Sequence, residues 1–271
     1  MTPATDRSVP AARSRETGRP TDPRVDPRAP GTGRRPPERT RIRCLAVDYS
    51  GTLADPGPVL TGTLVAAAVG ADAPEAFAAA FDAEARAHRS RGRRTDIATV
   101  IASAARELDF RLPASPAVIT EGLWSLWPDS PVRPDAAEAL HTLHAAGYAI
   151  VLACNTRRPV PVRRRTLAAA GVLSCFRGLV LSSSIGHAKP APPFYQHVLQ
   201  SAGQPAAAVL FVGDTFAKDV EAPRAHGMPA VWVAPDRAAS AGADPGVPVI
   251  SRFAELPALL EEHHRDRLIA P

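Results

Sequence analysis

The stretch Arg41–Leu53, RIRCLAVDYSGTL, decides the fold class of this chain. Its apolar run ends at Asp48, which indicates a short buried strand that carries a carboxylate at its carboxyl end. From Pro134 onward, apolar runs typical of strands alternate with segments of helical spacing. This alternation predicts an α/β protein with a three-layer core, in which helices cover both faces of a parallel sheet.

The predicted elements can be placed by residue number. Besides the first strand, strands are expected at 148–153, 179–182, 208–213, 230–233 and 247–250. Helices are expected at 135–146, 162–170, 192–202, 217–226 and 254–265. Residues 59–127 are different, because their Ala-rich stretches predict about four helices, with Thr95 or Asp96 and Ser115 as helix starts. In a parallel sheet, ligands bind at the carboxyl ends of the strands.

The positive charge of the chain is concentrated at its amino terminus. The 271 residues carry a formal charge of +5, which raises the question of a nucleic-acid partner. Residues 1–40 hold +4 of this charge and eight of the 29 prolines, and few large apolar side chains, so we expect a disordered tail. The tail has no aromatic residues to stack on bases. This favours a solvated extension over a nucleic-acid-binding arm.

Composition also bears on compartment and scaffold. Apolar runs stay well short of the roughly 20 residues that a membrane span requires, so no membrane partner is expected. The amino terminus lacks the apolar stretch of a secretory signal, so we expect a cytoplasmic protein. The three cysteines show no paired metal-ligand spacing, which argues against a disulfide scaffold and a structural zinc site.

Polar residues follow the predicted strands in four places. Asp48 ends the first strand, and Cys154, Asn155 and Thr156 follow the second, where small polar groups could bind an anion. Lys189 lies in the proline-bounded turn GHAKPAP, and Asp214 and Asp219 follow a later strand, where two carboxylates could hold a hard cation. Each feature alone has an ordinary structural interpretation: a turn former, a loop, a surface charge or a helix cap.

Taken together and in this order, the four motifs resemble the haloacid dehalogenase superfamily, most of whose members are magnesium-dependent phosphohydrolases. The resemblance covers about residues 41–265. It implies a Rossmann-like core at 41–55 and 132–271, with a small all-helical cap domain at 56–131.

The resemblance also implies a role for each motif. Asp48 is expected to be the nucleophile that forms an aspartyl-phosphate. Mg²⁺ is expected at the Asp48 carboxylate, the Ser50 carbonyl and Asp214, with Asp219 orienting Asp214 or a metal-bound water. Lys189 is expected to neutralise Asp48 and the phosphoryl oxygens. Cys154, Asn155 and Thr156 are expected to bind the phosphate, although a thiol is a poorer donor than the hydroxyl usual there.

Ser50 departs from the family pattern, because phosphatases of this superfamily usually carry a second aspartate there as the general acid and base. A hydroxyl with an ordinary pKa is a poor proton donor. The expected activity is therefore hydrolysis of a small phosphorylated metabolite, either a monoester or an acyl phosphate. The alternative is a weak or inactive relative that binds a phosphorylated ligand or partner.

Several basic residues are candidate contacts for an anionic substrate. Arg157 and Arg158 directly follow the second motif, and Arg91 and Arg94 lie between two predicted helices of the expected cap. A solvated basic turn explains the second pair equally well. The chain has only two lysines, Lys189 and Lys218. Lys218 lies between Asp214 and Asp219 and could be a substitute cation, but a salt bridge is the favoured role.

Overall fold

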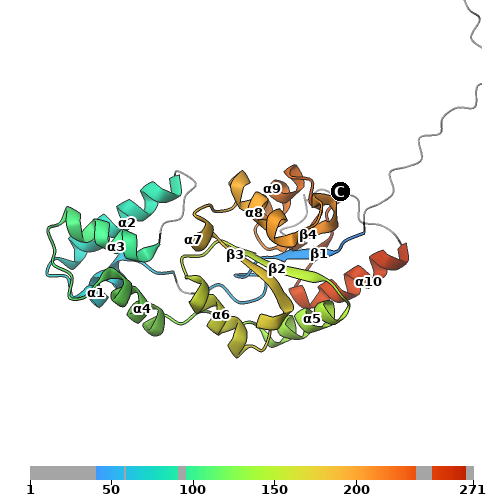
Figure 1. Cartoon of the computed structure of the whole chain (residues 1–271), viewed down its shortest axis with the longest axis horizontal. Helices are drawn as coiled ribbons and strands as arrows, with labels where there is room; N and C mark the ends of the chain where they lie inside the picture. Colours follow the sequence, from blue (N-terminus) through green and yellow to red (C-terminus); the bar gives the residue numbers. More distant parts are fainter. Residues whose placement is uncertain (1–40, 58, 91–95, 236–245, 267–271) are drawn as a thin grey trace, which may run out of the picture. The chain divides into compact units, whose positions relative to one another are not determined.

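The sheet of this protein is parallel throughout. The computed structural model describes residues 41–57, 59–90, 96–235 and 246–266 (Figure 1). Six strands hydrogen-bond in the order β3-β2-β1-β4-β5-β6. They are β1 (Cys44–Val47), β2 (Ala149–Cys154), β3 (Phe176–Leu181), β4 (Val209–Gly213), β5 (Ala230–Val233) and β6 (Val249–Ile250). The parallel sheet predicted from the alternating pattern is confirmed.

Helices cover both faces of the sheet because successive strand residues point to opposite sides. Leu45 and Val47 of β1 belong to the apolar cluster that contains residues of α5 (Pro134–Ala145), α6 (Val160–Ala169) and α10 (Leu256–Asp266). Cys44 and Ala46 belong to the opposite cluster, which contains residues of α8 (Pro192–Ala202) and the turn before α9 (Ala222–Ala225). The protein is therefore the three-layer, Rossmann-like α/β fold expected from its sequence.

The strand order places a switch point at β1. The chain adds β2 and β3 on one side of β1 and then returns to add β4 on the other. Crevices at the carboxyl ends of strands on either side of such a reversal are where α/β proteins bind ligands. Residues that follow β1, β2 and β4 are therefore brought together.

Residues between β1 and α5 form a helical insertion, a name used below for residues 56–131. Its helices are α1 (Gly62–Val69), α2 (Pro74–Ser90), α3 (Ile97–Glu107) and α4 (Pro116–Leu126). Phe77, Phe81 and Ile101 are buried in an apolar cluster distinct from the two on the sheet. Two of the predicted starts are confirmed: Asp96 precedes α3, and the Ser115 hydroxyl caps α4 by accepting from the Val118 N–H at 3.4 Å.

The insertion leaves and rejoins the core at one place. Ala54 and Val132 form an isolated antiparallel bridge. Beside it, the backbone N–H of Arg133 donates to the Leu53 carbonyl at 2.9 Å, and the Arg133 guanidinium donates to the Thr52 carbonyl at 2.5 Å. The two connecting segments are therefore paired to each other.

Some predicted elements differ from the observed ones. The helix expected at 217–226 is a π-helical turn, η3 (Phe216–Glu221), followed by the short α9. Strand β3 begins at Phe176 and not at Leu179, because its pairing with β2 continues past Arg177 and Gly178, which interrupt the apolar pattern. A short helix, α7 (Ser182–Ile185), follows β3 and was not predicted.

The sequence also predicts a disordered amino-terminal tail and no membrane-spanning helix. The predicted tail at 1–40 lies outside the described residues. Within the described ranges, no helix combines the length and apolar character needed to cross a bilayer. The division into a core and a cap, and a cytoplasmic location, stay predictions.

Candidate active site

Three carboxylates meet at the carboxyl ends of β1 and β4. Asp48 directly follows β1, Asp214 directly follows β4, and Asp219 lies in the π-helical turn η3. Each offers an oxygen, and these oxygens all lie within 4.8 Å of one another. Asp48 and Asp219 are buried. Adjacent parallel strands thus bring together carboxylates separated by more than 160 residues of sequence, a donor set suited to a hard divalent cation.

Lys189 lies between two of these carboxylates. Its Nζ donates to Asp48 Oδ1 at 2.7 Å and to Asp219 Oδ1 at 2.6 Å, and the side chain is buried. Burial raises the pKa of Asp48 and of Asp219, and the ammonium of Lys189 opposes this rise. Burial by itself lowers the pKa of Lys189, but the two carboxylates outweigh it and raise that pKa. Lys189 therefore stays a cation at neutral pH.

Asn155 holds the backbone of Lys189 in place. Its Nδ2 donates to the Lys189 carbonyl at 2.9 Å, while its Oδ1 accepts from the Lys189 N–H at 2.8 Å. The amide side chain was expected to bind phosphate directly. In this structure both its donor and its acceptor engage the lysine turn, so Asn155 links the second motif to the third.

Thr156 is fixed by a residue that the sequence did not single out. The Ser182 hydroxyl accepts from the Thr156 N–H at 2.8 Å and donates to the Thr156 carbonyl at 3.0 Å. Ser182 ends the predicted third strand, and that position was its only signal in the sequence. Cys154 is buried, and this burial raises the pKa of its thiol to about 11, so it stays protonated at neutral pH.

Two glycines allow the carboxylates to approach the backbone. Gly51 has φ 82°, and a Cβ built on it would lie 2.3 Å from Asp214 Oδ2. A Cβ on Gly213 would lie 2.4 Å from the carboxyl carbon of Asp219. Neither distance is possible for a real side chain, so the close packing of the carboxylates depends on glycine at both positions.

Asp214 is also fixed through its backbone. The indole Nε1 of Trp232, on β5, donates to the Asp214 carbonyl at 2.8 Å. The Trp232 ring packs edge-on against Phe216, with ring centroids 4.9 Å apart. Sequence reasoning missed Trp232, whose only signal is its place near the end of a predicted strand.

Ser50 lies two residues after Asp48 and is exposed. It forms a parallel bridge with Ala54, and the adjacent Gly51 N–H donates to the Ala54 carbonyl at 2.7 Å. The position usually occupied by an aspartate therefore carries a hydroxyl at the surface of the loop.

The arginines expected to reach a substrate lie in different surroundings. The Arg157 guanidinium is 5.9 Å from the centre of the Phe81 ring on α2, so it contacts the helical insertion. Arg158 is buried, and its guanidinium donates to backbone carbonyls of residues 127 and 128. The Arg158 guanidinium therefore binds the segment between α4 and α5. Arg91 and Arg94 lie outside the described residues.

Lys218 differs from Lys189 in its contacts. The salt bridge expected for its side chain is not formed with any described residue. Its backbone carbonyl instead accepts from the Tyr195 hydroxyl at 2.5 Å. Lys218 therefore contacts Tyr195 of α8 through its backbone carbonyl.

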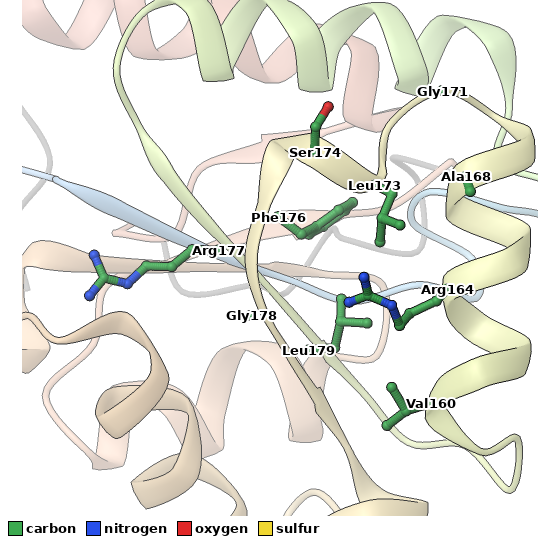
Figure 2. A pocket seen from close by; sticks show the side chains of 10 residues that line it. All are labelled: Val160, Arg164, Ala168, Gly171, Leu173, Ser174, Phe176, Arg177, Gly178 and Leu179. Carbon is green, nitrogen blue, oxygen red and sulfur yellow. The ribbon is translucent and has the colours of Figure 1, made fainter.

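A cavity of about 710 Å³ lies between α6 and the edge strand β3 (Figure 2). Leu173, Phe176 and Leu179 project into the space between these elements, whereas Arg177 points away from it. None of the residues predicted for the active site lines this cavity. It is therefore separate from the carboxylate cluster.

Comparisons with known proteins place this geometry in a family. The family model of haloacid dehalogenase-like hydrolases matches residues 42–227, well over half of the chain. A phosphoserine phosphatase from Thermus thermophilus is 33% identical over 104 residues, which are 38% of this chain and 41% of that protein. The chain thus matches less than half the length of that relative.

Solved structures share the fold at low identity. A HAD phosphatase from Thermococcus onnurineus is 19% identical with a TM-score of 0.55, covering 81% of this chain and 98% of that one. A 2-haloacid dehalogenase from Pseudomonas syringae is 20% identical with a TM-score of 0.58, covering 82% and 99%. Phosphatases and dehalogenases thus share this architecture, and the family match is what assigns the chain. This protein belongs to the haloacid dehalogenase-like hydrolases.

Proposed function

We propose that this hydrolase is a Mg²⁺-dependent phosphohydrolase that acts on a small phosphorylated molecule. One observation carries the proposal: the Asp48, Asp214 and Asp219 carboxylates converge at the carboxyl ends of β1 and β4, where the buried Lys189 pairs with Asp48 and Asp219. The phosphoserine phosphatase relative supports phosphate chemistry over other hydrolytic chemistry. Dehalogenases displace halide without a metal, so the retained Asp214 and Asp219 favour the phosphatase over a dehalogenase.

The donor set fits Mg²⁺. Carboxylate oxygens are its preferred protein ligands, and three of them converge within 4.8 Å. The proposed ligands are the Asp48 and Asp214 carboxylates and the Ser50 carbonyl. Asp219 would orient Asp214 or a metal-bound water. A bound Mg²⁺ would offset the negative charge of the carboxylates and of the phosphoryl oxygens.

Asp48 is the proposed nucleophile. A carboxylate oxygen attacks phosphorus, and the bond from phosphorus to the leaving-group oxygen breaks, which yields an aspartyl-phosphate on Asp48. Water then hydrolyses this intermediate, releasing inorganic phosphate and restoring the carboxylate. The Lys189 ammonium, 2.7 Å from Asp48 Oδ1, stabilises the negative charge that gathers on the phosphoryl oxygens.

Ser50 points to a leaving group that departs without a proton. An alkoxide must be protonated as it leaves, and an exposed serine hydroxyl is a poor acid. An acyl phosphate releases a carboxylate, which is stable unprotonated at neutral pH. We therefore propose acyl phosphates, or esters with similarly acidic leaving groups, as the preferred substrates, with residues 56–131 acting as the cap over the site.

Phosphate release tests the proposal directly. The protein is incubated with acetyl phosphate, 4-nitrophenyl phosphate and a panel of alkyl phosphate esters. We expect Mg²⁺-dependent release that falls to background with EDTA and returns when Mg²⁺ is restored. Halide release from 2-haloacids, assayed in parallel, serves as the competing activity. The proposal is wrong if halide is released and phosphate is not.

Restoring the missing acid separates a slow enzyme from a binding protein. In Ser50→Asp, hydrolysis of alkyl phosphate esters is expected to rise by about 10²-fold, the usual contribution of a positioned general acid. Acetyl phosphate hydrolysis should change much less, because its leaving group needs no proton. If calorimetry shows tight Mg²⁺-dependent binding of a phosphorylated ligand, and neither protein turns it over, the alternative of a phospho-ligand-binding protein replaces the enzyme.

A further inference from the structure

A buried ionic cluster lies where the helical insertion rejoins the core. Asp129, between α4 and α5, pairs with Arg158 Nε at 3.0 Å and with Arg163 Nη1 at 2.8 Å. The Thr166 hydroxyl also donates to Asp129 Oδ2, at 3.2 Å. The Asp129 side chain is only 7% exposed, so this carboxylate is compensated by protein groups and not by water.

Arg158 connects Asp129 to the loop that follows β2. The Arg158 N–H donates to the Thr156 hydroxyl at 3.0 Å, so its backbone belongs to that loop. Its guanidinium donates to the carbonyls of Trp127 and Pro128, at 2.7 and 3.1 Å, beside the ion pair with Asp129. One side chain thus attaches the loop after β2 to three successive residues of the connecting segment.

Arg163 connects the same carboxylate to the loop that follows β1. Its guanidinium carbon lies 3.4 Å from the centre of the Tyr49 ring, which is stacking distance. Tyr49 directly follows Asp48, and its hydroxyl donates to the Ser130 carbonyl at 2.5 Å. Burial raises the pKa of Tyr49 to about 12, so this hydroxyl remains a donor.

Asp129 therefore contacts, through two arginines, both loops that carry the candidate catalytic groups. A buried ion pair is a weak source of stability, because the desolvation of its charges offsets their attraction. The cluster can instead select one arrangement of the groups around it, through the Thr166 hydrogen bond to Asp129, the Arg158 bonds to two backbone carbonyls and the stacking of Arg163 on Tyr49. We propose that Asp129 is a positioning residue that sets how the Asp48 loop and the Asn155–Thr156 loop lie relative to each other. The catalytic part of this inference rests on the proposed function.

Asp129→Asn tests the inference, because it keeps the shape of the side chain and removes the charge. With 4-nitrophenyl phosphate we expect kcat to fall by about tenfold or more while KM changes less than about threefold, since misplaced groups weaken the transition state more than substrate binding. The matched control is Glu121→Gln, which breaks the exposed ion pair between Glu121 on α4 and Arg165 on α6. That variant should retain the wild-type kcat.

Hydrogen exchange gives a readout that does not depend on turnover. In Asp129→Asn, backbone amides of residues 49–54 and 155–158 are expected to exchange faster, while those of α8 stay protected as in the wild type. If both loops keep their wild-type exchange, Asp129 does not position them and the inference is wrong. If exchange accelerates uniformly across the protein, Asp129 only stabilises the fold, and the inference is again wrong. A wild-type protein without phosphatase activity would refute the proposed function and leave the exchange result to decide this inference.

Arg163→Lys serves if Asp129→Asn does not fold. Lysine keeps a cation opposite Asp129 but loses the planar group that stacks on Tyr49. We expect faster exchange at residues 49–54 and unchanged exchange at 155–158, because the Arg158 contacts remain. Equal acceleration in both loops, or in neither, would contradict the separate roles assigned to the two arginines.

Discussion

Asp48→Asn is expected to reduce Mg²⁺-dependent phosphate release by roughly 10³-fold or more, the scale on which loss of a catalytic nucleophile acts. The amide has nearly the same shape as the carboxylate, but it is neutral and a poor nucleophile towards phosphorus. Its carbonyl oxygen can still accept from Lys189, which lies 2.7 Å from Asp48 Oδ1 in the wild type. The change should therefore remove the chemistry and keep the fold. Phosphate release under single-turnover conditions measures the effect.

The folded state of Asp48→Asn needs an independent check. Near-ultraviolet circular dichroism should match the wild type, because Tyr49 and Trp232 report on the packing around Asp48 and Asp214. Trapping of labelled phosphate on the wild type, and not on the variant, would locate the covalent intermediate at Asp48. A variant that folds and keeps more than about a tenth of the wild-type rate would exclude Asp48 as the nucleophile.

Lys189→Met is expected to lower kcat by about 10²- to 10³-fold, as does removal of other groups that stabilise transition-state charge. The methionine leaves the Asp48 and Asp219 carboxylates buried without the cation that contacts both at 2.7 and 2.6 Å. The backbone at residue 189 stays in place, because Asn155 bonds to its N–H and carbonyl and not to its side chain. Steady-state kinetics at saturating Mg²⁺ measures the loss.

The chain supplies a matched control in its second lysine. Lys218→Met removes the same charge at a position next to Asp219 and three residues after Thr215, and it keeps the backbone carbonyl that Tyr195 contacts. Its kcat should stay within about twofold of the wild type, because Lys189 and not Lys218 is the cation paired with Asp48 and Asp219. Equal losses in the two variants would show that net charge near the site matters and that the position of Lys189 does not.

Much of the fold and site followed from local patterns. Alternating apolar runs and helical segments predicted the parallel sheet, since each run must be buried on both faces. Asp48 and Asp214 were found because each directly follows such a run, and the order of strands in the sheet then places them side by side. A site residue can therefore be predicted from local sequence when its place at the end of a strand is enough to put its side chain in the site.

Other site residues depend on contacts that no local pattern encodes. Ser182 forms two hydrogen bonds with the backbone of Thr156, and Trp232 forms one with the Asp214 carbonyl, in each case between segments that follow or belong to neighbouring strands. Asp129 lies in a connecting segment with ordinary loop composition, and its importance comes from arginines about 30 residues later. The turn η3 was predicted as a regular helix, because hydrogen-bond spacing within a turn is not visible in residue types.

The paired connecting segments at Ala54 and Val132 also have a consequence for how the protein can change. Since the insertion starts and ends at one bridge, its two ends already lie at the separation that a tight turn would close. Changes in helices α1 to α4 can therefore leave the path of every described strand unaltered, provided that Asp129 and its contacts with Arg158 and Arg163 are kept.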